Sequence, residues 1–186
     1  MLLIGDVHGR TKEYLEIVNC NTKSIQVGDI GFDFDYSLLP SHAKIVGGNH
    51  HNYDKLKQSE AYLGDYGTYD DFFFVRGAHS PDKNYRIEGV SWWRDEELSY
   101  NELYKAIDLY ATVRPYMMIT HTCPQSIIPL LGGKESWGSV TEKALQSMLE
   151  LHEPRIWIFG HFHKSFRKRI GRTLFVCLDE LETVNI

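Results

Sequence analysis

Short, mainly apolar runs that end at glycine recur along the chain. The first three cover residues 2–4, 24–27 and 43–46, and Gly5, Gly28 or Gly47 follows directly. An apolar run of this length, bounded by a turn residue, is typical of a buried β-strand. Glycine at the end of a strand lets the backbone turn sharply. The pattern therefore predicts three strands in the first quarter of the chain.

Five later segments have the same character and predict further strands. They cover residues 72–75, 116–119, 155–159, 165–170 and 173–178. The last two are separated by Gly171, which predicts a hairpin. Between residues 61 and 71 the chain is rich in Tyr, Gly and Asp and is predicted to be a loop. Residues 85–87 and 90–92 are predicted to pair through Glu88 and Gly89.

Helices are predicted between these strands. Ser99 with Glu102, and Ser139 with Glu142, have the spacing of a capping box, in which the serine accepts a backbone hydrogen bond at the helix start. The two helices are expected to end near residues 110 and 151. Shorter helices are predicted over 12–19, with Thr11 as cap, and over 53–58. Strands that alternate with helices predict an α/β layered fold with functional residues in its loops.

Composition limits the class of protein. The 186 residues suffice for one domain, residues 1–186, with its own core. The formal net charge is −5, and the densest basic cluster, Arg167–Arg169, is short. Because a nucleic-acid partner requires a positive surface, this charge disfavours one.

The cysteines and the apolar runs are typical of a cytoplasmic protein. Cys20, Cys123 and Cys177 are odd in number and widely spaced, so reduced thiols in a cytoplasmic protein are expected. No signal peptide is predicted, and no apolar run has the roughly 20 residues of a membrane helix.

Side chains able to bind a metal follow five of the predicted strands. They are Asp6, His8, Asp29, Asn49, His50, His121, His161 and His163. In extended backbone, residues at i and i+2 point the same way, so the side chains of Asp6 and His8 would point to the same side of the strand. A set of imidazole, carboxylate and amide groups without thiolate suits Mn, Fe, Zn, Ni or Co better than a structural zinc site.

The order and spacing of these residues resemble the calcineurin-like metallophosphoesterase family, and in particular its small prokaryotic and phage members. The family pattern is D-x-H, G-D, G-N-H-[D/E], H and G-H-x-H. The chain contains Asp6-Val7-His8, Gly28-Asp29, Gly48-Asn49-His50, His121 and Gly160-His161-Phe162-His163. The resemblance implies a four-layer α-β-β-α sandwich, in which two mixed sheets are flanked by helices.

The resemblance also implies a site for two divalent metal ions, with Mn²⁺ preferred and Fe, Zn, Ni or Co as alternatives. The implied ligands of the first ion are Asp6, His8 and His163, those of the second are Asn49, His121 and His161, and Asp29 bridges the two. A metal-bridging hydroxide would attack a phosphomonoester or phosphodiester in line. His50 would act as general acid on the leaving oxygen.

Two departures from the family pattern concern the groups around the metals. His51 stands where the family usually has an acidic residue after G-N-H, and it is expected at the surface. Phe32 and Asp33 occupy the Asp-Arg positions of the phosphoprotein phosphatases, so Asp33 or Asp35 would have to orient His50. Arg76 is the arginine predicted to contact the substrate phosphate, with a structural ion pair as the alternative.

The expected partner is a phosphorylated small molecule or a phosphoprotein, with neither a nucleic acid nor a membrane. The substrate, the native metal and the oligomeric state are left open by the sequence. The alternative function is that of an inactive scaffold of the same fold, acting as a protein-interaction module. Because such scaffolds normally lack metal ligands or the proton donor, which this chain has, the enzyme is favoured.

Overall fold

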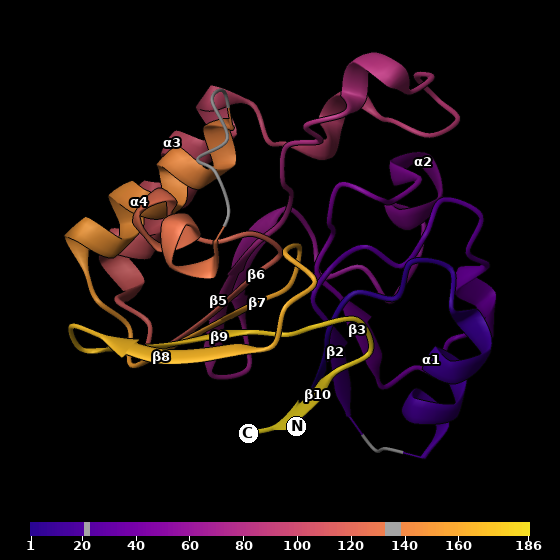
Figure 1. The fold of residues 1–186 in the computed structure, drawn as a ribbon, viewed down its shortest axis with the longest axis horizontal. Helices are drawn as coiled ribbons and strands as arrows, with labels where there is room; N and C mark the ends of the chain where they lie inside the picture. The colour runs from indigo at the N-terminus through magenta and orange to yellow at the C-terminus, as the bar shows by residue number, and fades with distance from the viewer. Residues whose placement is uncertain (21–22, 133–138) are drawn as a thin grey trace.

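Two β-sheets lie at the centre of the computed structural model, which describes residues 1–20, 23–132 and 139–186 (Figure 1). The first sheet has the strand order β10-β1-β2-β3. Its strands are β1 (Leu2–Ile4), β2 (Ser24–Gln26), β3 (Ala43–Ile45) and β10 (Thr183–Asn185). The first three are parallel, and β10 is antiparallel to β1. The pairing of β1 with β10 brings the two termini together (Figure 1).

The second sheet has the order β4-β5-β6-β7-β9-β8. Its four inner strands are parallel, and each outer strand is antiparallel to its neighbour. The bounds are β4 (Tyr66–Tyr69), β5 (Phe72–Val75), β6 (Met117–Thr120), β7 (Ile156–Phe159), β8 (Phe166–Ile170) and β9 (Thr173–Cys177). Both sheets are therefore mixed, as predicted.

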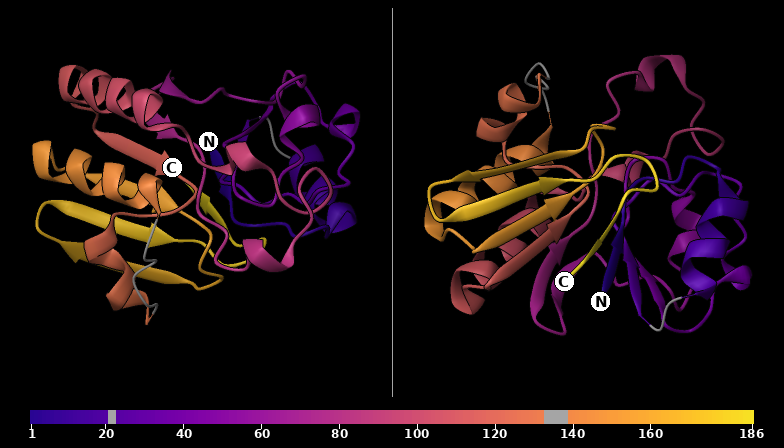
Figure 2. Two further views of the ribbon diagram at one scale, coloured as in Figure 1. Left: turned by 90° about the horizontal axis from the view of Figure 1, so that it is seen from above. Right: turned by 60° about the horizontal axis from the view of Figure 1, so that its bottom comes forward.

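Helices cover the outer faces of the two sheets (Figure 2). On the first sheet lie α1 (Thr11–Asn19) and α2 (Tyr53–Leu56), and on the second lie α3 (Tyr100–Val113) and α4 (Val140–Leu151). Short 3₁₀ turns occur at Tyr36–Leu38, Lys83–Tyr85, Arg94–Glu96 and Gln125–Leu131. The predicted four-layer α-β-β-α sandwich is confirmed. Among the described residues, no helix has the length and apolar character needed to cross a membrane.

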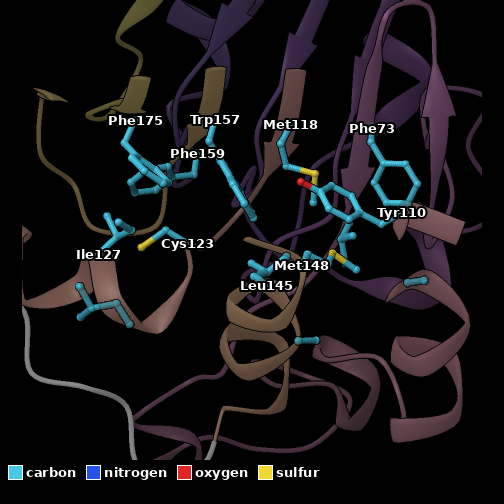
Figure 3. Close-up of a cluster of buried hydrophobic side chains, with 14 of the residues drawn as sticks. Phe73, Tyr110, Met118, Cys123, Ile127, Leu145, Met148, Trp157, Phe159 and Phe175 are labelled. Atoms are coloured by element: carbon cyan, nitrogen blue, oxygen red, sulfur yellow. The ribbon is translucent and has the colours of Figure 1, made fainter. Parts of the chain in front are cut away.

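Three buried apolar clusters separate the four layers. The middle cluster joins the two sheets, with Leu3 and Ile25 from one and Phe74 and Ile119 from the other. A second cluster lies under α1 and α2. The third fills the space between the second sheet and α3 and α4, where aromatic side chains of the strands point toward the helices (Figure 3). Each large side chain buried in this way contributes about 1.5–3 kcal/mol.

The predicted elements are largely confirmed, including the capping box of Ser99 with Glu102 and the serine cap of α4. The prediction for Thr11 is wrong, because α1 begins at Thr11 and Arg10 holds the cap position without a side-chain hydrogen bond. The predicted loop over 61–71 contains β4. This strand has no apolar run, and its pairing with β5 defines it.

The hairpin predicted over 85–92 is also wrong. The carbonyl of Ile87 instead accepts the N–H groups of Val90, Ser91 and Trp92, which closes a tight turn. Ile87 is 66% exposed, so no apolar face holds these residues in extended form. The strand β10 has no apolar run and escapes sequence analysis, because only its pairing with β1 defines it.

Candidate metal centre

All eight side chains predicted for the site meet at the carboxyl ends of the parallel strands. Asp6 and His8 follow β1, Asp29 follows β2, and Asn49 and His50 follow β3. From the second sheet come His121, after β6, and then His161 and His163, after β7. Loops after parallel strands leave a sheet at the same edge, so distant parts of the chain are brought to one place.

One group of converging side chains consists of Asp6, His8 and His163. The Nε2 atoms of His8 and His163 lie 2.8 Å apart. Asp6 Oδ2 is 3.6 Å from the first of these nitrogens and 3.3 Å from the second. Two imidazole nitrogens and a carboxylate oxygen that point at a common centre form a suitable ligand set for a divalent cation.

A second group consists of Asp29, His121 and His161, with Asn49 beside them. His121 Nε2 lies 3.1 Å from Asn49 Oδ1 and 3.2 Å from Asp29 Oδ1. The rings of His121 and His161 meet edge to face with centroids 4.9 Å apart. This group also presents nitrogen and oxygen ligands without thiolate.

Asp29 lies between the two groups. Its Oδ1 is 3.2 Å from His121 Nε2, and its Oδ2 is 3.8 Å from His8 Nε2. It also accepts the backbone N–H of His50 at 2.7 Å, which fixes the plane of the carboxylate. Asp29 therefore faces both groups and is the carboxylate that two bound cations would share.

The charges of the cluster fit bound cations. Asp6 and Asp29 are fully buried, and buried carboxylates need compensating positive charge. Burial opposes ionisation of Asp29, yet the charge and hydrogen bond of His121 hold its pKa well below the usual value. Burial lowers the pKa of His161 to about 3, so its imidazole is neutral and keeps a lone pair for a metal.

Four of the candidate ligands have left-handed backbone. Their φ angles are 45° at His8, 58° at Asp29, 68° at His161 and 48° at His163. Residues with a Cβ rarely adopt this region, and each instance costs on the order of 1–3 kcal/mol. Strain of this kind persists where the surrounding structure enforces it and it aims side chains at a functional site.

Neighbouring groups orient the candidate ligands. His121 Nδ1 lies 2.9 Å from the carbonyl of Val27 and donates to it, so Nε2 is the nitrogen that faces Asp29 and Asn49. Burial opposes protonation of His121, yet Asp29 raises its pKa to about 9, so a metal bound at Nε2 would displace a proton from it. Asn49 donates to Ser80 Oγ at 3.1 Å, and Ser80 in turn donates to Glu96 at 2.7 Å. Sequence analysis missed Ser80 and Glu96, because they lie outside the motifs and only the fold brings them to Asn49.

Two glycines give the ligands room. A Cβ at Gly48 would lie 2.8 Å from His121 Nε2 and still closer to Asp29 Oδ1, and a Cβ at Gly160 would overlap Asp6 Oδ1. These glycines are therefore required by close approach to the ligands.

Gly48→Ala is expected to lower the affinity for divalent cations by about 10- to 100-fold, because the methyl group displaces Asp29 and His121. Isothermal titration with Mn²⁺ measures the change. Gly64→Ala is the control for backbone strain and loss of stability, since alanine is strained at the φ of 107° of Gly64 but meets no atom within 4 Å of its Cβ position. Unchanged Mn²⁺ uptake by Gly48→Ala would contradict the placement of the ligands.

His50 lies at the rim of the cluster, with its ring 4.9 Å from that of His8 and stacked on Phe32. Burial lowers its pKa, and the charge of Arg86 adds to the effect. Arg86 Nη2 is 2.7 Å from His50 Nε2. Because arginine only donates, this nitrogen accepts, and the imidazole is neutral with its proton on Nδ1.

The expectation that His51 lies at the surface is wrong. The ring is fully buried, and its Nδ1 lies 3.0 Å from the hydroxyl of Tyr36. Burial lowers the pKa of His51 to about 3. His51 is therefore a buried residue. Asp35, one of the two carboxylates expected to orient His50, instead accepts from the N–H and the hydroxyl of Ser37 at 3.0 and 2.7 Å.

Arg76 is placed in an ion pair with Asp65 and stacks on the ring of Tyr53, with its Cζ 4.5 Å from the ring centroid. It is only 2% exposed. These contacts correspond to the structural ion pair that the sequence left as the alternative. Arg86, which sequence analysis missed, is the arginine in contact with His50.

A hollow of about 450 Å³ opens beside the cluster. It is lined by His8 and His50, by residues of the two loops that follow β1 and β2, among them Gly9 and Phe32, and by Thr11 at the start of α1. Of the candidate ligands, His8 is thus accessible from this side, next to His50.

The sequence matches no protein-family model and no curated protein. Its structure is similar to that of a dimetal phosphatase from Danio rerio, with a TM-score of 0.56 and 13% identity over 98% of this chain and 88% of that one. It is also similar to a putative 5'-nucleotidase from Staphylococcus aureus in complex with alpha-ketoglutarate, with a TM-score of 0.56 and 13% identity over 97% of this chain. The chain spans about half the length of the latter protein, 48%. It therefore has the metallophosphoesterase fold, as its motifs predicted.

Proposed function

We propose that this protein is a metal-dependent phosphoric ester hydrolase with a binuclear site. The observation that carries the proposal is the position of Asp29, with one carboxylate oxygen toward His8 and the other toward His121. The fold supports it, because solved structures of this fold include a dimetal phosphatase.

The candidate ligands divide between the two ions as the family resemblance implies. Asp6, His8 and His163 would hold the first ion, Asn49, His121 and His161 the second, and Asp29 both. When bound, the ions supply Lewis acidity that activates water and positive charge that neutralises phosphoryl oxygens. Mn²⁺ is the proposed metal, with Fe, Zn, Ni or Co as alternatives.

His50 is proposed as the general acid for the leaving oxygen. It lies beside the ligands and lines the hollow through which a substrate would enter. To donate a proton from Nε2, His50 has to lose its hydrogen bond from Arg86 and take up a proton on this nitrogen, which accepts in the structure. A phosphoryl group is a stronger acceptor for a guanidinium than a neutral imidazole. Substrate binding would therefore transfer the hydrogen bond of Arg86 from His50 to the phosphoryl group.

The proposed substrate is a phosphorylated small molecule or a phosphoprotein, as monoester or diester. The net charge of −5 disfavours nucleic acid. The free thiols of Cys123 and Cys177 fit a reducing, cytoplasmic location.

Hydrolysis of p-nitrophenyl phosphate and bis(p-nitrophenyl) phosphate tests the proposal. With Mn²⁺ added, release of p-nitrophenolate from at least one ester is expected, and removal of the metal by a chelator is expected to abolish it. Absence of turnover with each of the five metals named above would contradict the proposal. Uptake of two ions without turnover, together with a stable protein partner, would instead support the scaffold function.

A further inference from the structure

The segment between β5 and α3, residues 76–99, runs above α2 in Figure 1 and contacts Asn49 and His50 of the candidate metal centre. It is fixed near both of its ends. Ser80 binds both Asn49 and Glu96, and the N–H of Gly77 donates to the carbonyl of Gly47 at 2.7 Å. Further along, Trp93 donates to Asp54 of α2 at 3.1 Å. The segment is therefore held in one position relative to the metal ligands.

Arg86 is the side chain of this segment that turns toward the site. Its Nε lies 2.8 Å from Asp82 Oδ1, its Nη1 is 3.3 Å from the carbonyl of Ser91, and its Nη2 is 2.7 Å from His50 Nε2. The side chain is only 14% exposed. Three partners on three nitrogens hold the guanidinium in a defined orientation, and two of its five N–H groups are left to donate.

We propose that Arg86 binds the phosphoryl group of the substrate and makes this site select phosphomonoesters over phosphodiesters. The inference rests on the proposed hydrolase function and adds the substrate class. A monoester carries two negative charges near neutral pH and three terminal oxygens, whereas a diester carries one charge and two such oxygens. A guanidinium next to His50 gains most from the additional charge and oxygen of the monoester.

Arg86 lies beside the loop that follows the G-D motif. The Cζ of Arg86 is 5.8 Å from the centroid of the Phe32 ring, and the next residue, Asp33, stands where the family's phosphoprotein phosphatases have their arginine. A cation is thus present next to this loop, although it comes from a different segment of the chain. Asp82, which forms an ion pair with Arg86, is not one of the candidate metal ligands. Its carboxylate fixes the orientation of the guanidinium group.

Arg86→Gln tests the selectivity directly when the two p-nitrophenyl esters are compared. Both esters release the same leaving group, so the contribution of His50 cancels from the ratio. For the monoester, kcat/KM is expected to fall by about 10- to 100-fold, as for a lost hydrogen bond between charged groups, while the diester changes little. Arg86→Lys, which keeps the charge but not the fork, is expected to lie between wild type and Arg86→Gln.

Arg94→Gln is the matched control, because Arg94 lies on the same segment but is 80% exposed and pairs with Glu88. It is expected to leave both esters unaffected. Isothermal titration with inorganic phosphate gives a readout independent of turnover, and Arg86→Gln is expected to raise the Kd about 10- to 100-fold while Mn²⁺ uptake is unchanged.

The outcomes separate the two proposals. If wild type hydrolyses the esters but Arg86→Gln affects both equally, or neither, the inference about Arg86 is overturned and the hydrolase function stands. If wild type hydrolyses neither ester, the hydrolase function fails. Loss of Mn²⁺ uptake by Arg86→Gln would show that the arginine supports the metal centre and would also overturn the inference.

Discussion

Asp29→Asn is expected to reduce the turnover of phosphate esters by at least about 10²- to 10³-fold and to weaken the uptake of both metal ions. The substitution removes the negative charge that faces both His8 and His121 while keeping the size of the side chain. An amide also replaces one of the two carboxylate oxygens with an NH₂ group, which does not bind a metal. Asp6 also lies 3.6 Å from His8 and 3.9 Å from His121, but it faces His121 at Nδ1, the nitrogen next to the carbonyl of Val27, whereas Asp29 faces Nε2 at 3.2 Å. The larger effect is therefore expected at Asp29.

Titration with Mn²⁺ separates this effect from simple loss of folding. The variant is expected to bind with lower affinity or with fewer ions per chain, with its secondary structure preserved by circular dichroism. Asp108→Asn, at an exposed position of α3 outside the cluster and the hollow, is the control and should resemble wild type. A variant that keeps full activity and binds two ions would show that Asp29 does not bridge them.

His50→Gln is expected to have the second large effect, and the effect should depend on the leaving group. Turnover of an alkyl phosphate should fall by about 10²- to 10⁴-fold, because its alkoxide needs a proton to leave. Turnover of p-nitrophenyl phosphate should fall far less, since p-nitrophenolate leaves unprotonated. Comparison of kcat for the two esters is the measurement.

Metal uptake of His50→Gln should remain close to that of wild type. His152→Gln serves as control, because His152 contacts the carbonyl of Pro115 and takes no part in the cluster. An equal loss for both esters would indicate that His50 positions the substrate without donating a proton.

The candidate site could be found from sequence because its residues follow short strands in a readable order. In each case an apolar run ends at or near a glycine, and a side chain with metal affinity comes next, as in Gly28-Asp29 and Gly160-His161. Both signals are local. A strand is recognised from its run of apolar residues, and a glycine from the turn or close approach that its missing side chain permits. The layered fold followed from the same alternation of strands and helices.

The groups around the ligands could not be found in this way. Ser80 and Glu96 orient Asn49, and Arg86 contacts His50, yet none of them follows a strand end or belongs to a motif. The segment that carries them was expected to form a hairpin and is instead held by contacts with α2 and the metal centre. Hydrogen bonds between residues so far apart in sequence leave no periodic pattern to detect.

By itself, the sequence of this protein determined eight of the ten strands and the four α-helices of the described residues, and it singled out the eight side chains that the fold brings together. These follow from side-chain polarity and backbone preference, which act over a few residues. The tertiary structure alone decided that β10 closes the first sheet, that His51 is buried and that Arg76 pairs with Asp65 while Arg86 faces the site. Burial and charge pairing depend on which surfaces meet, and that is settled only when the two sheets and their helices pack.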